Sequence, residues 1–154
     1  PRFTNVKKGT KNIVYLWARK EFQNISKCYD CGISVVKPRH VSKNILIMDF
    51  EGIDGKPEQT LLESETDEND YRQSISLITD LYQKAKLVHG DFSEYNIFKT
   101  KNGLKIFDLG SAVDTIHPNT IEFLKRDINN ITNFFVKRGL TVENPADILE
   151  RVIK

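Results

Sequence analysis

The stretch Leu87-Val-His-Gly-Asp-Phe-Ser-Glu-Tyr-Asn96, followed further along by Asp108-Leu-Gly110, decides how this chain of 154 residues folds. Two β-like runs lie between these segments and are joined by Asn102-Gly103, the strongest short signal for a β-hairpin because both residues tolerate a positive φ. In an antiparallel hairpin, the residue that enters the first strand lies beside the residue that leaves the second. The sequence therefore predicts that the hairpin brings together three polar side chains, those of Asp91, Asn96 and Asp108.

Two carboxylates and one carboxamide that converge in this way suit a hard divalent cation, because Mg²⁺ takes oxygen ligands and keeps several waters. An Asp-x₄-Asn loop followed by Asp-x-Gly after a short hairpin is typical of the acidic half of a phosphotransferase site. In such a site one Asp orients or deprotonates the acceptor, while the Asn and the second Asp hold the metal on the phosphates. The alternative is that Asp91 and Asn96 are ordinary turn residues and that Asp108 caps a strand end.

The N-terminal third of the sequence predicts a helix followed by a pair of strands. Apolar residues recur at helical spacing over Lys11–Asp30, and Glu21 projects within the same arc. A buried carboxylate needs a cationic or hydrogen-bonding partner, unless Glu21 reaches water at the edge of the arc. Two β-like runs follow, Ser34–Val41 and Asn44–Phe50, and we expect them to pair antiparallel with Pro38 at an edge or a break. The predicted apolar face of the helix consists of Val14, Trp17, Ala18, Phe22, Ile25 and Tyr29.

The rest of the chain predicts a linker and three more helices. Residues Glu51–Asn69 contain Gly, Pro and acidic residues, which is typical of a linker with one short turn. The predicted helices run over about Asp70–Lys86, from His117-Pro118 to Arg138-Gly139, and over Ala146–Lys154 after Asn144-Pro145. Together with the hairpins, they predict an α+β fold.

The composition excludes several classes of protein. Hydrophobic residues make up 39% and charged residues 29%, so bulk disorder is excluded. No apolar run approaches the roughly 18 residues of a membrane helix, and we expect no membrane partner. The net charge of +2 is too balanced to indicate nucleic-acid binding by itself. With only two cysteines, Cys28 and Cys31, we expect a cytoplasmic protein with structural or surface thiols rather than a zinc site.

The motif residues resemble those of the protein-kinase-like superfamily. The sequences that flank them resemble the RIO family of atypical serine/threonine kinases, closest to its Rio-one-like branch. The resemblance rests on 87–96 with Asp108-Leu-Gly-Ser-Ala-Val113, and on the tail of His117-Pro118, Glu122-Phe-Leu-Lys-Arg-Asp127, Asn130 and Phe134-Phe135. Upstream, Trp17-Ala-Arg-Lys-Glu-Phe-Gln-Asn24 resembles the helix C of that family and Ile47-Met-Asp-Phe-Glu-Gly52 its hinge.

The resemblance implies a kinase C-lobe over residues 51–154 and a remnant of the N-lobe over residues 1–50. It implies that Asp91 is the catalytic aspartate, that Asn96 and Asp108 are metal ligands, and that Glu21 is the helix C glutamate that pairs with a lysine. It also places Met48, Asp49 and Glu51 at the hinge, where the backbone of Asp49 and Glu51 meets the adenine edge. The implied cofactors are ATP and Mg²⁺, with Mn²⁺ as an alternative metal. The implied activity is that of a serine/threonine kinase or ATPase, and the implied partners are the pre-ribosomal small subunit and its protein or rRNA components.

The sequence also departs from a complete kinase. No two of its eight glycines have the spacing of a phosphate-cradling loop, and no Val-Ala-Ile-Lys-like strand precedes the first helix. With Pro1 at its start, the chain is expected to be an N-terminally truncated fragment that is weakly active or inactive, with self-association or disorder around residues 1–50. Two other functions stay open at this point: a small-molecule phosphotransferase of the aminoglycoside or choline kinase type, and a non-catalytic binding module.

Overall fold

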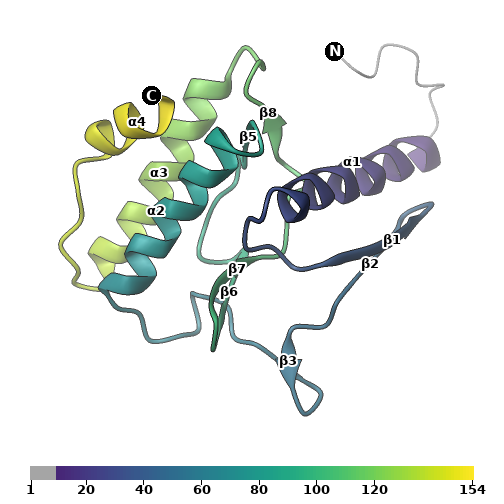
Figure 1. Cartoon of the computed structure of the whole chain (residues 1–154), viewed down its shortest axis with the longest axis horizontal. Helices are drawn as coiled ribbons and strands as arrows, with labels where there is room; N and C mark the ends of the chain where they lie inside the picture. The colour runs from purple at the N-terminus through teal and green to yellow at the C-terminus, as the bar shows by residue number, and fades with distance from the viewer. Residues whose placement is uncertain (1–9) are drawn as a thin grey trace.

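The computed structural model describes residues 10–154, which form four helices and four two-stranded antiparallel pairs. The mixed α+β class predicted from the sequence is confirmed. Helices α2 (Glu68–Gln83), α3 (Thr120–Lys137) and α4 (Pro145–Ile153) pack on one another on one side of the molecule (Figure 1). Helix α1 (Thr10–Asp30) lies on the other side, against the hairpin of β1 (Pro38–Ser42) and β2 (Ile45–Met48).

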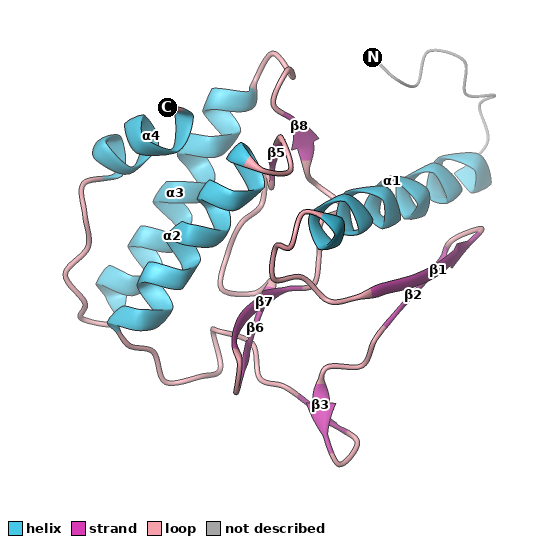
Figure 2. Cartoon of the chain, viewed as in Figure 1, coloured by secondary structure: helices cyan, strands magenta, loops and turns pink. Residues whose placement is uncertain are grey.

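The predicted hairpin lies between these two groups of elements and consists of β6 (Ile97–Thr100) and β7 (Gly103–Ile106) (Figure 2). Gly103 has a φ of +112°, which a glycine adopts without strain. On the other edge of β7, the Ile106 N–H donates to the Ser34 carbonyl and the Ile106 carbonyl accepts from the Val36 N–H. Strand β7 is therefore bonded along both edges and joins the N-terminal elements to the helical part.

The paired β-like runs predicted at 34–50 are correct only in part. Pro38 has no backbone N–H, and the register shifts between Pro38 and His40. The run therefore breaks there: residues 38–42 pair with β2, whereas Val35 and Val36 are buried and lie along β7.

The prediction of a linker at 51–69 is wrong. This segment forms a small hairpin of β3 (Gly52–Ile53) and β4 (Lys56–Pro57), and then packs along β6. The Leu61 N–H donates to the Ile97 carbonyl at 2.8 Å, and the Leu61 side chain is fully buried. The segment has only three aliphatic residues, Ile53, Leu61 and Leu62, and they show no helical or strand period, so the signal in the sequence that it packs on the core was too weak.

The predicted apolar face of the first helix is also wrong in part. Ala18 and Ile25 are buried, but Trp17 and Tyr29 are exposed to 64% and 41%. Cys28, which was not part of the predicted face, is fully buried, while Cys31 is exposed and neither forms a disulfide. The buried face of α1 is thus narrower than the predicted apolar face and is rotated away from it. Residues 1–9, where part of the expected disorder or self-association falls, lie outside the described residues.

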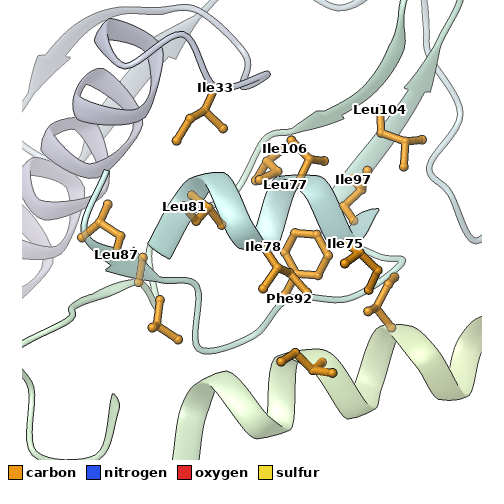
Figure 3. Close-up of a cluster of buried hydrophobic side chains, with 14 of the residues drawn as sticks. Ile33, Ile75, Leu77, Ile78, Leu81, Leu87, Phe92, Ile97, Leu104 and Ile106 are labelled. Atoms are coloured by element: carbon orange, nitrogen blue, oxygen red, sulfur yellow. The ribbon is translucent and has the colours of Figure 1, made fainter. Parts of the chain in front are cut away.

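The hydrophobic core gathers around α2 and the hairpin (Figure 3). Helix α2 begins with a capping box, in which the Asp67 side chain accepts from the Asp70 N–H and the Asp70 side chain accepts from the Asp67 N–H. Helix α3 begins at Thr120, later than the His117-Pro118 signal, and ends before Gly139, whose φ of +86° is expected after a helix end. A pair that local patterns missed, β5 (Leu87–Val88) with β8 (Val113–Asp114), anchors both ends of the motif region. No helix of the described residues is long and apolar enough to cross a bilayer.

Candidate functional site

The base of the β6–β7 hairpin places Asn96 beside the residue that precedes Asp108. The Phe107 N–H donates to the Asn96 carbonyl at 3.2 Å, and Ile97 lies opposite Ile106. The Asn96 side-chain amide then donates to the Asp91 carbonyl at 2.9 Å. These contacts gather the three motif residues at one end of the hairpin. The Asp91 side chain is exposed there, and the Asn96 amide oxygen has no hydrogen bond within residues 10–154.

Helix α1 holds the loop that carries Asp108. The Asn24 amide donates to the carbonyls of Leu109 and Ala112 at 3.0 and 3.3 Å, and the Lys20 ammonium donates to the Gly110 carbonyl at 3.2 Å. The loop also closes on itself, because the Gly110 N–H donates to Asp108 Oδ1 at 2.9 Å. The sequence reasoning gave no role to Lys20 or Asn24. The signal that could have found them is helical spacing, because Asn24 lies three residues after Glu21 and four after Lys20.

Glu21 and Asp108 approach each other at Gly110. A Cβ built on Gly110 would lie 3.4 Å from Asp108 Oδ1 and 3.6 Å from Glu21 Oε2. Burial and, after it, the Asp108 carboxylate raise the pKa of Glu21. Two carboxylates this close to one position favour a cation nearby. The arrangement therefore fits a metal or ammonium group.

The donor set fits Mg²⁺ better than a transition metal. Residues 10–154 contain no group of three or more His, Cys, Asp and Glu side chains arranged to hold a metal ion. The site offers instead the Asp108 carboxylate and the Asn96 amide oxygen. Mg²⁺ is commonly bound through one or two carboxylates, several waters and substrate phosphates rather than through a complete protein cage.

A buried carboxylate of helix α3 binds the backbone N–H groups of the residues before and after Asp91. Asp127, only 1% exposed, accepts from the Gly90 N–H at 2.8 Å and from the Phe92 N–H at 2.9 Å. Burial raises the pKa of Asp127 to about 6, and the two N–H donors partly offset that rise. The sequence offered one sign of this role, since Asp127 interrupts the apolar face of α3 next to Ile128.

Position 90 requires glycine. Its φ is +77°, and a Cβ there would lie 3.1 Å from the Ser111 carbonyl oxygen. A side chain would meet both backbone strain and a clash with the loop that follows Asp108. The Gly of the His-Gly-Asp motif thus allows the Asp91 loop and the Asp108 loop to pack closely.

His89 supports the Asp91 loop from the core side. Its side chain is buried, it contacts Phe92 edge to face with 5.5 Å between ring centroids, and neither ring nitrogen has a hydrogen-bond partner among the described residues. Burial lowers the pKa of His89 to about 4, although the carboxylates of Asp108 and Asp91 act in the opposite direction. His89 is therefore neutral near pH 7 and acts as a packing residue.

Acid should destabilise the protein through His89. Its folded-state pKa lies below the ordinary value of 6.5, so its contribution to stability is complete above pH 6.5 and is lost as the pH falls toward about 4. From pH 7 to pH 5, we expect the unfolding free energy of the wild type to fall by about 2 kcal/mol more than that of His89→Gln, at about 1.4 kcal/mol per pH unit below 6.5. Urea denaturation at both pH values measures this. His117→Gln, at an exposed position, is the control and should follow the wild type; equal falls in wild type and His89→Gln would contradict the prediction.

The residues predicted to form the hinge lie at and just after the end of β2, and the two acidic side chains among them form ion pairs. Asp49 forms an ion pair with Arg39, and Glu51 accepts from the Lys105 ammonium at 2.7 Å, which connects this segment to β7. Met48 is half-buried at the end of β2. The Asp49 N–H donates to the Lys37 carbonyl and the Glu51 carbonyl accepts from the Glu58 N–H. The Asp49 carbonyl and the Glu51 N–H have no such partner within the described residues. The role of this segment in adenine binding stays a prediction.

Comparison with known proteins identifies the family. A model of the RIO domain matches residues 1–148, so this chain belongs to the RIO family. The RIO-type serine/threonine-protein kinase Rio1 of Haloferax volcanii is 38% identical over 95% of this chain and 51% of its own length. The corresponding Rio1 kinase of Thermoplasma acidophilum is 37% identical over 99% of this chain and 80% of its own length. The chain thus spans about half of the first of these relatives and most of the second.

Solved structures give the same family. The Rio2 kinase of Chaetomium thermophilum, in a complex described as ADP/Mg²⁺-phosphoaspartate, superimposes with a TM-score of 0.75 at 25% identity. The match covers 96% of this chain and 48% of the Rio2 chain. The resemblance inferred from the motif residues is confirmed, and the relatives that carry it are serine/threonine kinases.

Proposed function

We propose that the protein carrying this chain is a RIO-type serine/threonine kinase or ATPase that uses Mg²⁺ and ATP. The observation that supports this most is the meeting of Asp91, Asn96 and Asp108 at the base of one hairpin, with Glu21 of α1 facing Asp108. The ADP and Mg²⁺ in the Rio2 complex support the same ligands for this chain. In this proposal residues 51–154 act as the C-lobe, and residues 1–50 belong to the N-lobe.

The residues have distinct proposed roles. The Asn96 amide oxygen and the Asp108 carboxylate hold Mg²⁺, which when bound neutralises charge on the phosphates. Asp91 accepts the proton of the acceptor hydroxyl at a carboxylate oxygen and orients the acceptor oxygen for attack on the γ-phosphorus. Glu21 orients a cationic group toward the nucleotide. The backbone of Asp49 and Glu51 binds the adenine edge, beside Met48.

The phosphoaspartate named in the Rio2 complex favours a second outcome of the same chemistry. In that outcome an aspartate oxygen of the site attacks the γ-phosphorus, the bond to the ADP oxygen breaks, and water later hydrolyses the acyl phosphate. The net reaction is then ATP hydrolysis. Acid quenching after incubation with γ-labelled ATP distinguishes the two, because an acyl phosphate is released by hydroxylamine whereas phosphoserine is not.

We further propose, from the family resemblance, that the acceptor or partner belongs to the maturing small ribosomal subunit. Affinity purification of the whole protein carrying Asp91→Asn, which we expect to bind ATP without turnover, tests this. Enrichment of small-subunit precursors over mature subunits supports the assignment, and equal recovery of both contradicts it.

Asp108→Asn should remove the metal dependence of nucleotide binding. In the wild type, Mg²⁺ should tighten ATP binding at least about tenfold relative to binding in EDTA, which corresponds to about 1.4 kcal/mol. Asn keeps the size of the side chain but loses its charge, so the Mg²⁺ effect should largely disappear. Asp114→Asn is the matched control, because Asp114 pairs with Lys27 outside the site. Calorimetric titration of ATP with and without Mg²⁺ measures the effect in the wild type and in each variant. An Mg²⁺ effect in Asp108→Asn as large as that of the wild type would remove Asp108 from the metal site.

A further inference from the structure

A stack of three side chains connects the segment that follows Asp108 with the backbone of Asp91. His117, which lies between β8 and α3, stacks on Phe123 with 5.5 Å between ring centroids and 27° between the planes. The guanidinium carbon of Arg126 lies 5.1 Å from the centroid of the same Phe123 ring. Beyond the ring, an Arg126 Nη2 donates to the Gly90 carbonyl. The stack thus ends on the peptide bond that joins Gly90 to Asp91.

The hydrogen bonds from α3 cover three consecutive peptide units of the Asp91 loop. Asp127 accepts from the Gly90 N–H, which belongs to the 89–90 unit, and from the Phe92 N–H, which belongs to the 91–92 unit. The Gly90 carbonyl, held by Arg126, belongs to the 90–91 unit between them. Because φ and ψ of Asp91 are rotations about the bonds between units 90–91 and 91–92, both units must be held to fix its backbone. Asp127 holds only one of them, and Arg126 holds the other.

The rest of the stack keeps Arg126 in place. A guanidinium on a flexible side chain loses conformational entropy when it is held in one position, and a flat aromatic face restricts it. His117 packs on the same Phe123 ring and is itself held, because its Nδ1 accepts from the Asn119 N–H at 3.2 Å and its backbone N–H donates to the Asp114 carbonyl at 2.9 Å.

We propose that Arg126 is a positioning residue for Asp91, held by Phe123 and His117, and that it acts by fixing the 90–91 peptide unit. This inference rests on the proposed function of Asp91. Arg126 touches neither reacting atoms nor phosphate in this role, so its loss should lower kcat and leave ATP binding intact.

The chain contains a matched control for Arg126. Arg138, at the other end of α3, also donates from Nη2 to a backbone carbonyl, that of Leu62, and its guanidinium carbon also lies 5.1 Å from a phenylalanine ring, that of Phe134. The two arginines thus make the same two kinds of contact, but the carbonyl that Arg138 binds belongs to Leu62, outside the 90–92 segment. Arg138→Ala therefore removes one charge, one hydrogen bond to a backbone carbonyl and one contact with a phenylalanine ring, as Arg126→Ala does.

The test compares Arg126→Ala, Arg126→Lys and Arg138→Ala in the whole protein, with steady-state kinetics and amide hydrogen exchange. We expect Arg126→Ala to lower kcat about tenfold or more, because small misplacements of a reacting group have large effects on rate, with KM for ATP within about twofold. Arg126→Lys should recover part of the loss, since an ammonium can donate to the Gly90 carbonyl but lacks the planar stack. Exchange at the amides of residues 90–92 should be faster in Arg126→Ala alone.

Several outcomes would overturn the proposal. The proposal is wrong if the kcat of Arg126→Ala is within twofold of wild type, whatever the amide exchange rates. It is also wrong if Arg138→Ala lowers kcat as much as Arg126→Ala does. If Arg126→Ala does not fold, the same criteria apply to Arg126→Lys and Phe123→Leu. If the wild type itself shows no turnover, the proposed function fails, and amide exchange alone tests the positioning role of Arg126. Faster exchange in Arg126→Ala that is confined to residues 90–92 then supports this role, and unchanged exchange refutes it.

Discussion

Asp91→Asn is expected to reduce turnover by a factor of about 100 or more while leaving the affinity for ATP nearly unchanged. An amide has the size of the carboxylate but cannot accept the acceptor proton, and loss of a general base commonly lowers rates by 10²–10⁴. ATP affinity should hold because the assigned metal ligands are Asn96 and Asp108. The Asn96 amide donates to the backbone carbonyl of Asp91, which the substitution preserves. Initial rates and calorimetric ATP titrations of the whole protein measure the two quantities.

The same loop provides the control for Asp91→Asn. Glu94→Gln makes the same exchange of carboxylate for amide three residues later, where only the backbone carbonyl is engaged, by the Leu62 N–H. We expect Glu94→Gln to keep turnover within about threefold of wild type, because the half-buried Glu94 side chain forms no ion pair or hydrogen bond among the described residues and has no assigned role in the chemistry. Turnover of Asp91→Asn near that of Glu94→Gln would remove Asp91 from the catalytic role and favour a non-catalytic binding module.

The second large effect is expected from Asp127→Ala, on both stability and turnover. The substitution leaves the buried N–H groups of Gly90 and Phe92 without acceptors, each of which costs about 1–3 kcal/mol. Relief of the buried carboxyl offsets part of this. We therefore expect the unfolding free energy to fall by about 3 kcal/mol, and turnover to fall at least about tenfold because the Asp91 backbone is released. Urea denaturation and initial rates, both at pH 7, measure the two effects.

Glu122→Ala separates this effect from the loss of an acidic residue in α3. Glu122 lies in the first turn of the same helix, is exposed, and its side chain makes no hydrogen bond among the described residues. Its interaction with the helix dipole contributes only about 0.3–1 kcal/mol. A loss of stability in Asp127→Ala no larger than that in Glu122→Ala would show that the two buried N–H groups find other partners.

The sequence predicted the hairpin and the meeting of the motif residues because those signals are local. Asn102-Gly103 sets the turn, and the register of β6 and β7 then brings Asn96 next to Phe107. Helix α2 was predictable for the same reason, from its apolar spacing, although it runs over Glu68–Gln83 rather than over about 70–86.

The residues that hold the site in place could not be predicted in the same way. Asn24 bonds residues 85 and 88 positions away, and Asp127 bonds residues 35 and 37 positions away, so no pattern within one element shows these pairs. The apolar face of α1 misled the prediction because periodicity says which residues share a face and not how much of that face is covered. The segment 34–36 joined β7 because Pro38 interrupts the ladder that the residue types favoured.

The exposure of Trp17 has a spectroscopic consequence. It is the only tryptophan in the chain, and in the folded state its indole is already in contact with water. Its fluorescence therefore changes little when the protein unfolds, and denaturation is better followed by the far-ultraviolet signal of the helices. The same indole is a sensitive probe of anything that covers this side of α1, since transfer from water to an apolar contact shifts its emission to shorter wavelength.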